Sequence, residues 1–496
     1  MGSKVIIYQL LLRAFGNRHC VPGGSWSENG SGRFNDVTPE LLSKIRLLSA
    51  NAIWFTGVIS HATRTHFRNL ADCNRSIVKG EAGSPYSINN YFDVDPALAV
   101  NIDNRMQEFQ AMVDRTHKAG IKVIIDFVPN HVSREYHGEY FNKQNYYMLK
   151  GELHLPAELG SDYVENPARA TGNDVFHCHP GINDWYDTVK LNYENRDTWV
   201  KMLDILLFWA DKGVDGFRCD MAEMVPSAFF KWAFENVREK HPDTIFIAEV
   251  YDKNRYREYA EAGFDLLYDK SGFYDTLRAI ATSGASAREI TRRWQELGDL
   301  QPRMLNFLEN HDEQRVASDF FAGNGRRGFA ALAVSLLFNT APFMIYFGQE
   351  FGERGMEAEG FSGIDGRTSI FDYCTVPSVR RWIDNRLTLD ESVVYKEYCR
   401  LMRIAVGDAI FASGKSYDLM YANPDSDDFN GDRQFAWMRG IDGTAMLIVA
   451  NFDKVPVTVR VWIPGEAFAF FGIDTPGRFV TVKVNPCDYC RTDVSR

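Results

Sequence analysis

The sequence predicts an α/β protein built as a closed (β/α)8 barrel of the TIM-barrel type, with a subdomain inserted after the third strand and a C-terminal antiparallel β-sandwich. Short apolar runs alternate with amphipathic helical patterns over roughly the first 400 residues. One long polar stretch interrupts this alternation, and beyond Gly407 short β-rich runs replace the helical pattern. These observations set the order of elements that we expect.

Eight apolar runs have the length and composition of buried strands. They are residues 5–10, 52–56, 123–127, 216–219, 245–248, 264–268, 304–308 and 343–347. Helical patterns lie between them, such as residues 104–119, which Gly120 ends, and residues 196–212, which Gly213 ends. In a barrel of this kind the catalytic groups lie on the loops that follow the carboxyl ends of the strands.

The two changes of pattern divide the chain into three expected domains. Residues 1–131 and 196–406 form the barrel, residues 132–195 the inserted domain, and residues 407–496 the β-sandwich. The insertion is rich in Asn, Asp, Gly, His and Tyr and has no sustained helical period, which favours an excursion over the barrel mouth. The strands expected in the last domain are residues 434–438, 445–450 and 455–461.

Charge and hydropathy exclude several classes of partner. The net charge of -11 argues against nucleic acid, and no segment has the uninterrupted apolar length of a membrane helix. We therefore expect neither a nucleic-acid nor a membrane partner. We also expect the protein to be a monomer. The N-terminal apolar run is short, lacks a small-residue cleavage site and leads into Arg13, so we interpret it as a strand. As written the chain is expected to be cytoplasmic, or periplasmic or secreted if an export signal has been removed.

Four segments end apolar runs with polar groups. They are residues 126–131 (DFVPNH), 216–220 (GFRCD), 247–249 (IAE) and 310–312 (NHD). Three carboxylates stand among them: Asp220, Glu249 and Asp312. Cleavage of a sugar acetal takes one carboxylate as nucleophile and a second, with a raised pKa, as proton donor. A third carboxylate can hold the sugar ring.

In these motifs and their order, the chain resembles the α-amylase family of glycoside hydrolases (family 13) over essentially its whole length. The resemblance implies the barrel, the inserted domain and the C-terminal sandwich. It also implies that Asp220 is the nucleophile, that Glu249 is the general acid and then base, and that Asp312 binds sugar hydroxyls. The chemistry itself would require no cofactor.

Neighbouring residues agree with these roles. Arg218 lies two residues before Asp220, hence on the same face of a strand, and is expected to lower the pKa of Asp220. Apolar residues precede Glu249, and desolvation there is expected to keep its carboxyl protonated. The alternative, a purely structural ion pair of Asp220 with Arg218, does not explain Glu249 and Asp312 at matching strand ends.

The resemblance also implies residues that bind the sugar at the cleavage point. His131 and His311 would donate hydrogen bonds to ring hydroxyls, and Tyr86 would stack beneath the ring. Ser84 stands where the family usually has a His two residues before that Tyr. Asp126 is expected to orient Arg218 or His131 rather than to act as a catalyst.

The segment after the nucleophile departs from many amylases, which carry Lys-His at the positions of Glu223 and Met224. The sequences DMAEMV at 220–225 and TVKLN at 188–192 look closer to the neopullulanase and cyclomaltodextrinase group. Because the chain as given begins directly at the first strand, we expect it to differ from that group in lacking the N-terminal domain. Glu223, Met224 and Tyr251 are expected to flank the leaving-group side of the substrate.

Three functional classes follow from the resemblance. The first is a retaining α-glucan hydrolase that cleaves α-1,4-glucosidic bonds of starch fragments or maltooligosaccharides. The second is an α-glucan transglycosylase that uses the same catalytic residues. The third is a non-catalytic partner protein of the same fold, which the three acids disfavour.

A structural calcium ion is a further possibility that the resemblance raises. The family's site uses the Asn of the first motif, here Asn130, with an Asp and backbone carbonyls. Asn173 and Asp174 are candidate partners, and Met224 can offer only its carbonyl. The other interpretation is that Asn130 is a hydrogen-bonding strut without a metal.

Overall fold

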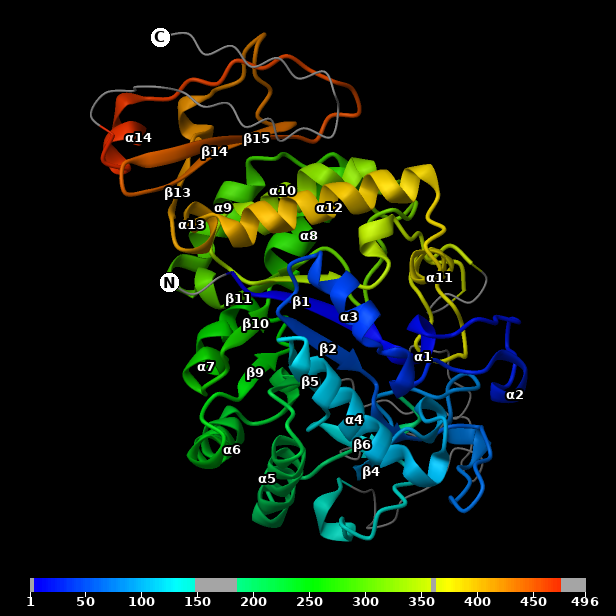
Figure 1. Ribbon diagram of the computed structural model, residues 1–496. Helices are drawn as coiled ribbons and strands as arrows, with labels where there is room; N and C mark the ends of the chain where they lie inside the picture. Colours follow the sequence, from blue (N-terminus) through cyan, green and yellow to red (C-terminus); the bar gives the residue numbers. More distant parts are fainter. Residues whose placement is uncertain (1–3, 148–184, 358–362, 474–496) are drawn as a thin grey trace, which may run out of the picture.

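The computed structural model describes residues 4–147, 185–357 and 363–473, and their centre is a closed parallel barrel (Figure 1). The strands follow the order β1-β12-β11-β10-β9-β8-β5-β2 around it, and β1 closes the ring by pairing with both β2 and β12. They are β1 (Ile6–Leu11), β2 (Ala52–Thr56), β5 (Lys122–Phe127), β8 (Gly216–Cys219), β9 (Ile245–Ala248), β10 (Leu266–Tyr268), β11 (Met304–Phe307) and β12 (Phe343–Tyr346). The predicted fold class is confirmed, and the eight strand ends differ from the expected ones by at most two residues.

These segments form strands because they are buried on both faces. All six residues of β1 and all five of β2 are buried, one face against the barrel interior and the other against the helices. Such strands appear in a sequence as continuous apolar runs rather than as alternating ones. This is why the runs were recognisable without any structure.

Helices surround the barrel. They are α3 (Pro39–Arg46), α4 (Arg105–Lys118), α5 (Arg196–Asp211), α6 (Ser227–Lys240), α7 (Tyr256–Glu261), α8 (Asp275–Ser283), α9 (Glu289–Leu297), α10 (Phe329–Leu337), α11 (Pro377–Ile383) and α12 (Leu389–Gly407). In α4, Phe109, Met112 and Val113 are buried at helical spacing, and Gly120 follows the end of the helix with a φ of 72° that favours glycine. None of the helices within the described ranges has the length and apolar character needed to cross a membrane.

Loops at the carboxyl ends of the strands are elaborated. The return of the predicted insertion is a two-stranded antiparallel ladder of β6 (His131–Ser133) and β7 (Thr188–Lys190), with His131 opposite Lys190. The middle of the insertion, residues 148–184, lies outside the described residues. A second hairpin, β3 (Ile59–His61) with β4 (Ile88–Val94), follows β2 and was not predicted. Two short helices, α1 (Leu12–Phe15) and α2 (Trp26–Asn29), follow β1.

Beyond the barrel, α13 (Ala409–Ala412) leads into an antiparallel sheet (Figure 1). Its strands lie in the order β13 (Lys415–Asp418), β14 (Gln434–Ile441) and β15 (Thr444–Asn451), followed by α14 (Gly465–Phe470). Asp442 and Gly443 join β14 to β15 with φ angles of 48° and 77°, the conformation of a tight type I′ turn.

Two details of the C-terminal sheet differ from the expectation. Residues 455–461 were expected to be a strand, but they are not paired in the structure, and residues 415–418 form the third strand instead. Buried Arg439 fastens this sheet to the barrel by donating hydrogen bonds to the carbonyls of Leu337 and Ile410. Residues 474–496 of the predicted sandwich lie outside the described residues.

A buried carboxyl shortly after the end of β12 makes stability depend on pH. Tyr8 on β1 donates a hydrogen bond of 2.6 Å to Glu350, and burial raises the pKa of Glu350 from 4.5 to about 7 although this bond opposes the shift. The folded state therefore favours the protonated acid, so stability falls as pH rises from the unfolded-state pKa through the folded one. As the pH rises from 5 to 8, the free energy of unfolding of Glu350→Gln should increase by about 2 kcal/mol relative to that of the wild type, as measured by urea unfolding.

Exposed Glu239 on α6 provides the matched control, because Glu239→Gln removes a solvated charge and should change the unfolding free energy equally at both pH values. A Glu350→Gln variant whose stability relative to the wild type did not change with pH would contradict the assignment.

Candidate active site

Four acidic residues meet at one end of the barrel. Asp126 is the next-to-last residue of β5, Asp220 follows β8, Glu249 follows β9 and Asp312 follows β11 by a few residues. Because β5, β8 and β9 are successive neighbours in the barrel, their carboxyl ends bring three of these acids together directly. Asp126, Asp220 and Glu249 are buried, whereas Asp312 is partly exposed.

The centre of this cluster is the guanidinium group of Arg218, which is completely buried. Its Nη1 donates to Asp220 Oδ1 at 2.6 Å, and its Nη2 lies 2.7 Å from Glu249 Oε1. Nε donates to the Tyr268 hydroxyl at 3.2 Å. One cation therefore holds both carboxylates, each on a different terminal nitrogen.

Aromatic rings enclose the same guanidinium. The rings of Trp54 and Tyr86 each have their centroids 5.3 Å from its central carbon, and that of Tyr268 lies at 5.6 Å. Such cation–π contacts keep water from Arg218 while stabilising its charge. Trp54 and Tyr268 were not identified from the sequence, although each lies in a run that was correctly predicted as a strand.

The two oxygens of Asp220 have different surroundings. Oδ1 accepts the hydrogen bond from Arg218, whereas Oδ2 accepts no hydrogen bond within the described residues. Burial raises the pKa of Asp220; Arg218 acts against this shift, and the nearby Glu249 carboxylate adds to it. The expectation that Arg218 lowers this pKa was therefore right about the partner but wrong about the net direction, because burial is the larger effect.

Glu249 is surrounded by donors rather than by the apolar groups that the sequence suggested. Besides the contact with Arg218, its Oε2 accepts the amide N–H of Met221 at 2.6 Å and its Oε1 accepts the hydroxyl of Tyr251 at 2.8 Å. Met221 has a φ of 44°, a left-handed conformation that costs a non-glycine residue about 1–2 kcal/mol. The strained turn after the nucleophile thus aims a backbone donor at Glu249.

His311 connects Asp312 to the barrel interior. Its Nδ1 lies 2.8 Å from the side-chain nitrogen of Gln9, and its Nε2 lies 2.6 Å from the Tyr86 hydroxyl and 3.0 Å from Asp312 Oδ2. Burial alone would raise the pKa of Asp312, but His311 lowers it, with help from Arg218. The Asp312 side chain is 30% exposed against 7% for Asp220 and 4% for Glu249, so it is the acid most open to a ligand.

Gln9 was not expected at the site. It is a polar residue in the middle of the apolar run of β1, and it is completely buried. A buried amide inside such a run requires hydrogen-bonding partners, which here are His311 and Thr56. That isolated polar position was the signal in the sequence that could have revealed it.

His131 and Asp126 also approach the ion pair of Asp220 with Arg218. His131 Nε2 is 3.8 Å from Asp220 Oδ2, and burial lowers the pKa of His131 to about 3, so its ring is neutral. Asp126 accepts the Gly57 amide at 3.0 Å and lies 3.7 Å from Arg218 Nη1. Asp126 therefore supports Arg218, the first of its two expected partners. Trp185, from the return of the insertion, packs edge-on against His131 and was not expected.

The Glu223 side chain is engaged with the protein itself. Its Oε2 accepts the amide N–H groups of Tyr251 and Asp252, each at 3.0 Å. Tyr251 in turn donates its hydroxyl to Glu249. The carboxylate of Glu223 thus fixes the backbone that immediately follows the proposed acid, on the side where the sequence suggested a contact with the leaving group.

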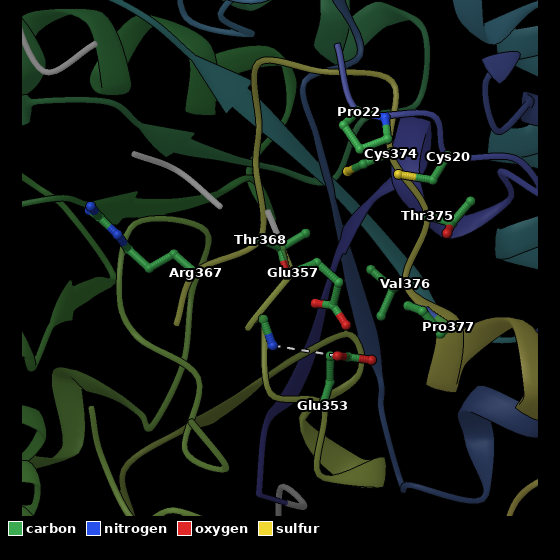
Figure 2. Close-up of a pocket in the computed structure, with 11 residues that line it drawn as sticks. Cys20, Pro22, Glu353, Glu357, Arg367, Thr368, Cys374, Thr375, Val376 and Pro377 are labelled. Atoms are coloured by element: carbon green, nitrogen blue, oxygen red, sulfur yellow. Dashed lines mark hydrogen bonds between the residues drawn. The ribbon is translucent and has the colours of Figure 1, made fainter. Parts of the chain in front are cut away.

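A cavity of about 340 Å³ lies between the loop after β1 and the segment after β12 (Figure 2). Cys20 from the loop after β1 and Glu353 and Cys374 from the segment after β12 line it, and the dashed line in Figure 2 marks the hydrogen bond from the Gly355 amide to Glu353. Arg367, also in the lining, donates to the carbonyl of Asp312 at 3.3 Å. In Figure 2 the Arg367 side chain points away from the other lining residues, and none of the four acids lines the cavity.

Comparison with known proteins assigns the chain to one family. A model described as alpha amylase, catalytic domain, matches residues 27–369. The chain belongs to the alpha-amylase family. Alpha-amylase MalA of Haloarcula japonica is 25% identical over 459 residues, covering 92% of this chain and 56% of that protein. Neopullulanase 2 of Thermoactinomyces vulgaris is 25% identical over 376 residues, covering 71% and 57% respectively. The chain thus spans little more than half the length of these two relatives.

Solved structures of the family share the fold. A cyclomaltodextrinase superimposes with a TM-score of 0.64 at 20% identity, covering 91% of this chain and 70% of that one. The maltogenic alpha-amylase AmyB of Thermotoga neapolitana gives a TM-score of 0.61 at 21% identity, covering 90% and 86%. At these identities the likeness establishes the architecture alone.

The contacts of Glu223 lead to a test of its role. We expect Glu223→Ala to lower kcat by about tenfold, because two amides lose their acceptor and the backbone next to Glu249 loosens. Glu223→Gln keeps one acceptor oxygen and should lose much less. Steady-state kinetics on maltoheptaose measure this, with Glu239→Ala on exposed α6 as the control. An effect on KM alone in Glu223→Ala would instead indicate a direct contact with substrate.

Proposed function

We propose that this protein is a retaining α-glucan hydrolase that cleaves α-1,4-glucosidic bonds of starch fragments or maltooligosaccharides. The observation that carries the proposal is the pairing of Asp220 and Glu249 with the two terminal nitrogens of Arg218. Retaining glycosidases need their two carboxyl groups about 5–5.5 Å apart, and inverting ones need more room for a water molecule. Two carboxylates on one guanidinium favour the shorter separation.

The first step divides the work between these two acids. Asp220 attacks the anomeric carbon through Oδ2, the oxygen that Arg218 leaves free, and forms a covalent glycosyl-enzyme. Glu249 gives a proton to the departing glycosidic oxygen. The two buried carboxyls and the guanidinium together carry no net charge when one carboxyl is protonated and the other is ionised. This step requires that charge state.

The second step reverses the role of Glu249. It takes a proton from water, which attacks the anomeric carbon and releases the sugar from Asp220 with net retention. Asp312, His311 and His131 bind ring hydroxyls, and these hydrogen bonds strengthen as the ring gains oxocarbenium character. Tyr86 lies against His311 with its ring nearly parallel, and it forms the floor of the same subsite.

Transglycosylation is the second candidate, because an acceptor sugar can replace water in the second step without any change in the acids. The family likeness supports it as well, since cyclomaltodextrin glucanotransferase of Geobacillus stearothermophilus is 25% identical over 378 residues, covering 70% of this chain and 49% of that protein. A non-catalytic role is disfavoured, because all three acids are present and Arg218 pairs with two of them, Asp220 and Glu249.

The two acids are distinguished by substitution. Asp220→Asn should abolish turnover of every substrate while the thermal unfolding curve stays intact, because no nucleophile remains. Glu249→Gln should lose about 10²–10⁴-fold on maltoheptaose, yet far less on α-maltotriosyl fluoride, whose leaving group needs little protonation. Equal losses on both substrates, or retained activity in Asp220→Asn, would contradict these roles.

Products separate hydrolysis from transfer. With maltoheptaose, soluble starch and pullulan, we expect new reducing ends, and NMR should show the α-anomer released first. With concentrated maltotriose, a hydrolase gives shorter sugars only, whereas a transglycosylase also gives chains longer than the substrate. If none of the three substrates released reducing ends, the substrate assignment would be wrong.

A further inference from the structure

The oxygens that the family resemblance offers to a calcium ion already have a cation between them. The side-chain oxygen of Asn130 accepts a hydrogen bond from Lys190 Nζ at 2.8 Å, and the carbonyl of Met224 accepts one from the same nitrogen at 3.1 Å. Calcium binds oxygen ligands at about 2.3–2.6 Å and would have to occupy the position of this ammonium group. These residues therefore do not fit the metal. The other candidates, Asn173 and Asp174, lie outside the described residues.

The fold places Lys190 at this position. It ends β7, opposite His131 of β6 in the ladder that closes the insertion, and the next amide, of Leu191, donates to the carbonyl of Asn130 at 3.0 Å. Asn130 itself is completely buried. The ammonium group thus joins three segments: the end of the β5 motif, the return of the insertion and the turn after the nucleophile.

We propose that the Lys190 ammonium is a built-in substitute for a divalent cation, which fastens the returning insertion to the turn behind Asp220 and frees the fold and the site from dependence on metal. A covalently attached cation cannot dissociate or be chelated. It carries one charge where calcium carries two, and it donates hydrogen bonds to oxygens that calcium would coordinate. Together with burial, the positive charge of Lys190 also favours the neutral form of His131, 3.8 Å from the nucleophile.

Metal dependence of the unmodified protein is the first test, and it needs no variant. The melting temperature and, where activity is present, kcat/KM on maltoheptaose should be unchanged by EDTA dialysis or by added calcium, with no stoichiometric calcium found by elemental analysis. The melting temperature is measured in any case, so this test stands even if the proposed hydrolase activity fails. Loss of stability in EDTA that calcium restores would overturn the proposal.

Substitution of Lys190 is the second test. Lys190→Met should lower the melting temperature by about 2–4 °C and kcat/KM by about tenfold, because Asn130 and Met224 lose their common donor. Lys190→Arg retains a cation and should lose less. Lys231→Met, on the exposed face of α6, is the matched control. Calcium should stabilise Lys190→Ala, in which the position between the two oxygens is vacant, and should not stabilise the wild type. A Lys190→Met variant indistinguishable from Lys231→Met would overturn the proposal.

Discussion

The active site depends on one buried ion-pair arrangement, in which the guanidinium of Arg218 holds Asp220 and Glu249 on separate nitrogens. Two buried carboxylates without that cation would repel each other and lose hydration together, at a cost of several kcal/mol. The barrel provides the geometry, because β8 and β9 pair in parallel and deliver the two acids side by side. The rings around Arg218 and the support from Asp126 then keep the guanidinium in a single position.

The four residues after the nucleophile, 221–224, make three separate contacts around the site. The backbone N–H of Met221 reaches Glu249, the carboxylate of Glu223 binds the amides after Glu249, and the carbonyl of Met224 accepts Lys190. This turn therefore couples the proposed acid to the inserted segment through two backbone groups and one carboxylate. Its strained φ at Met221 persists because these contacts determine the conformation from both sides.

The sequence was informative wherever burial was uniform along a segment. Strands such as β2 are apolar on both faces, and their ends carried the acids, so barrel and cluster could be placed in advance. Strand β13, whose residues are only partly buried, has no such signature. The net direction of the pKa of Asp220 also escaped prediction, because it depends on how deeply the loops cover the mouth rather than on the neighbouring Arg218.

Whether water or an acceptor sugar attacks the glycosyl-enzyme depends on which groups on the leaving-group side remain available to bind an acceptor. The Glu223 carboxylate is occupied by two backbone amides, and the Tyr251 hydroxyl is occupied by Glu249. The Tyr251 ring remains partly exposed, with Lys270 Nζ 5.7 Å from its centroid. An acceptor sugar would therefore meet this side mainly through stacking on one ring, whereas water needs no such contact. Since neither the Glu223 carboxylate nor the Tyr251 hydroxyl is free to orient an acceptor hydroxyl toward the anomeric carbon, these contacts support the proposal of hydrolysis.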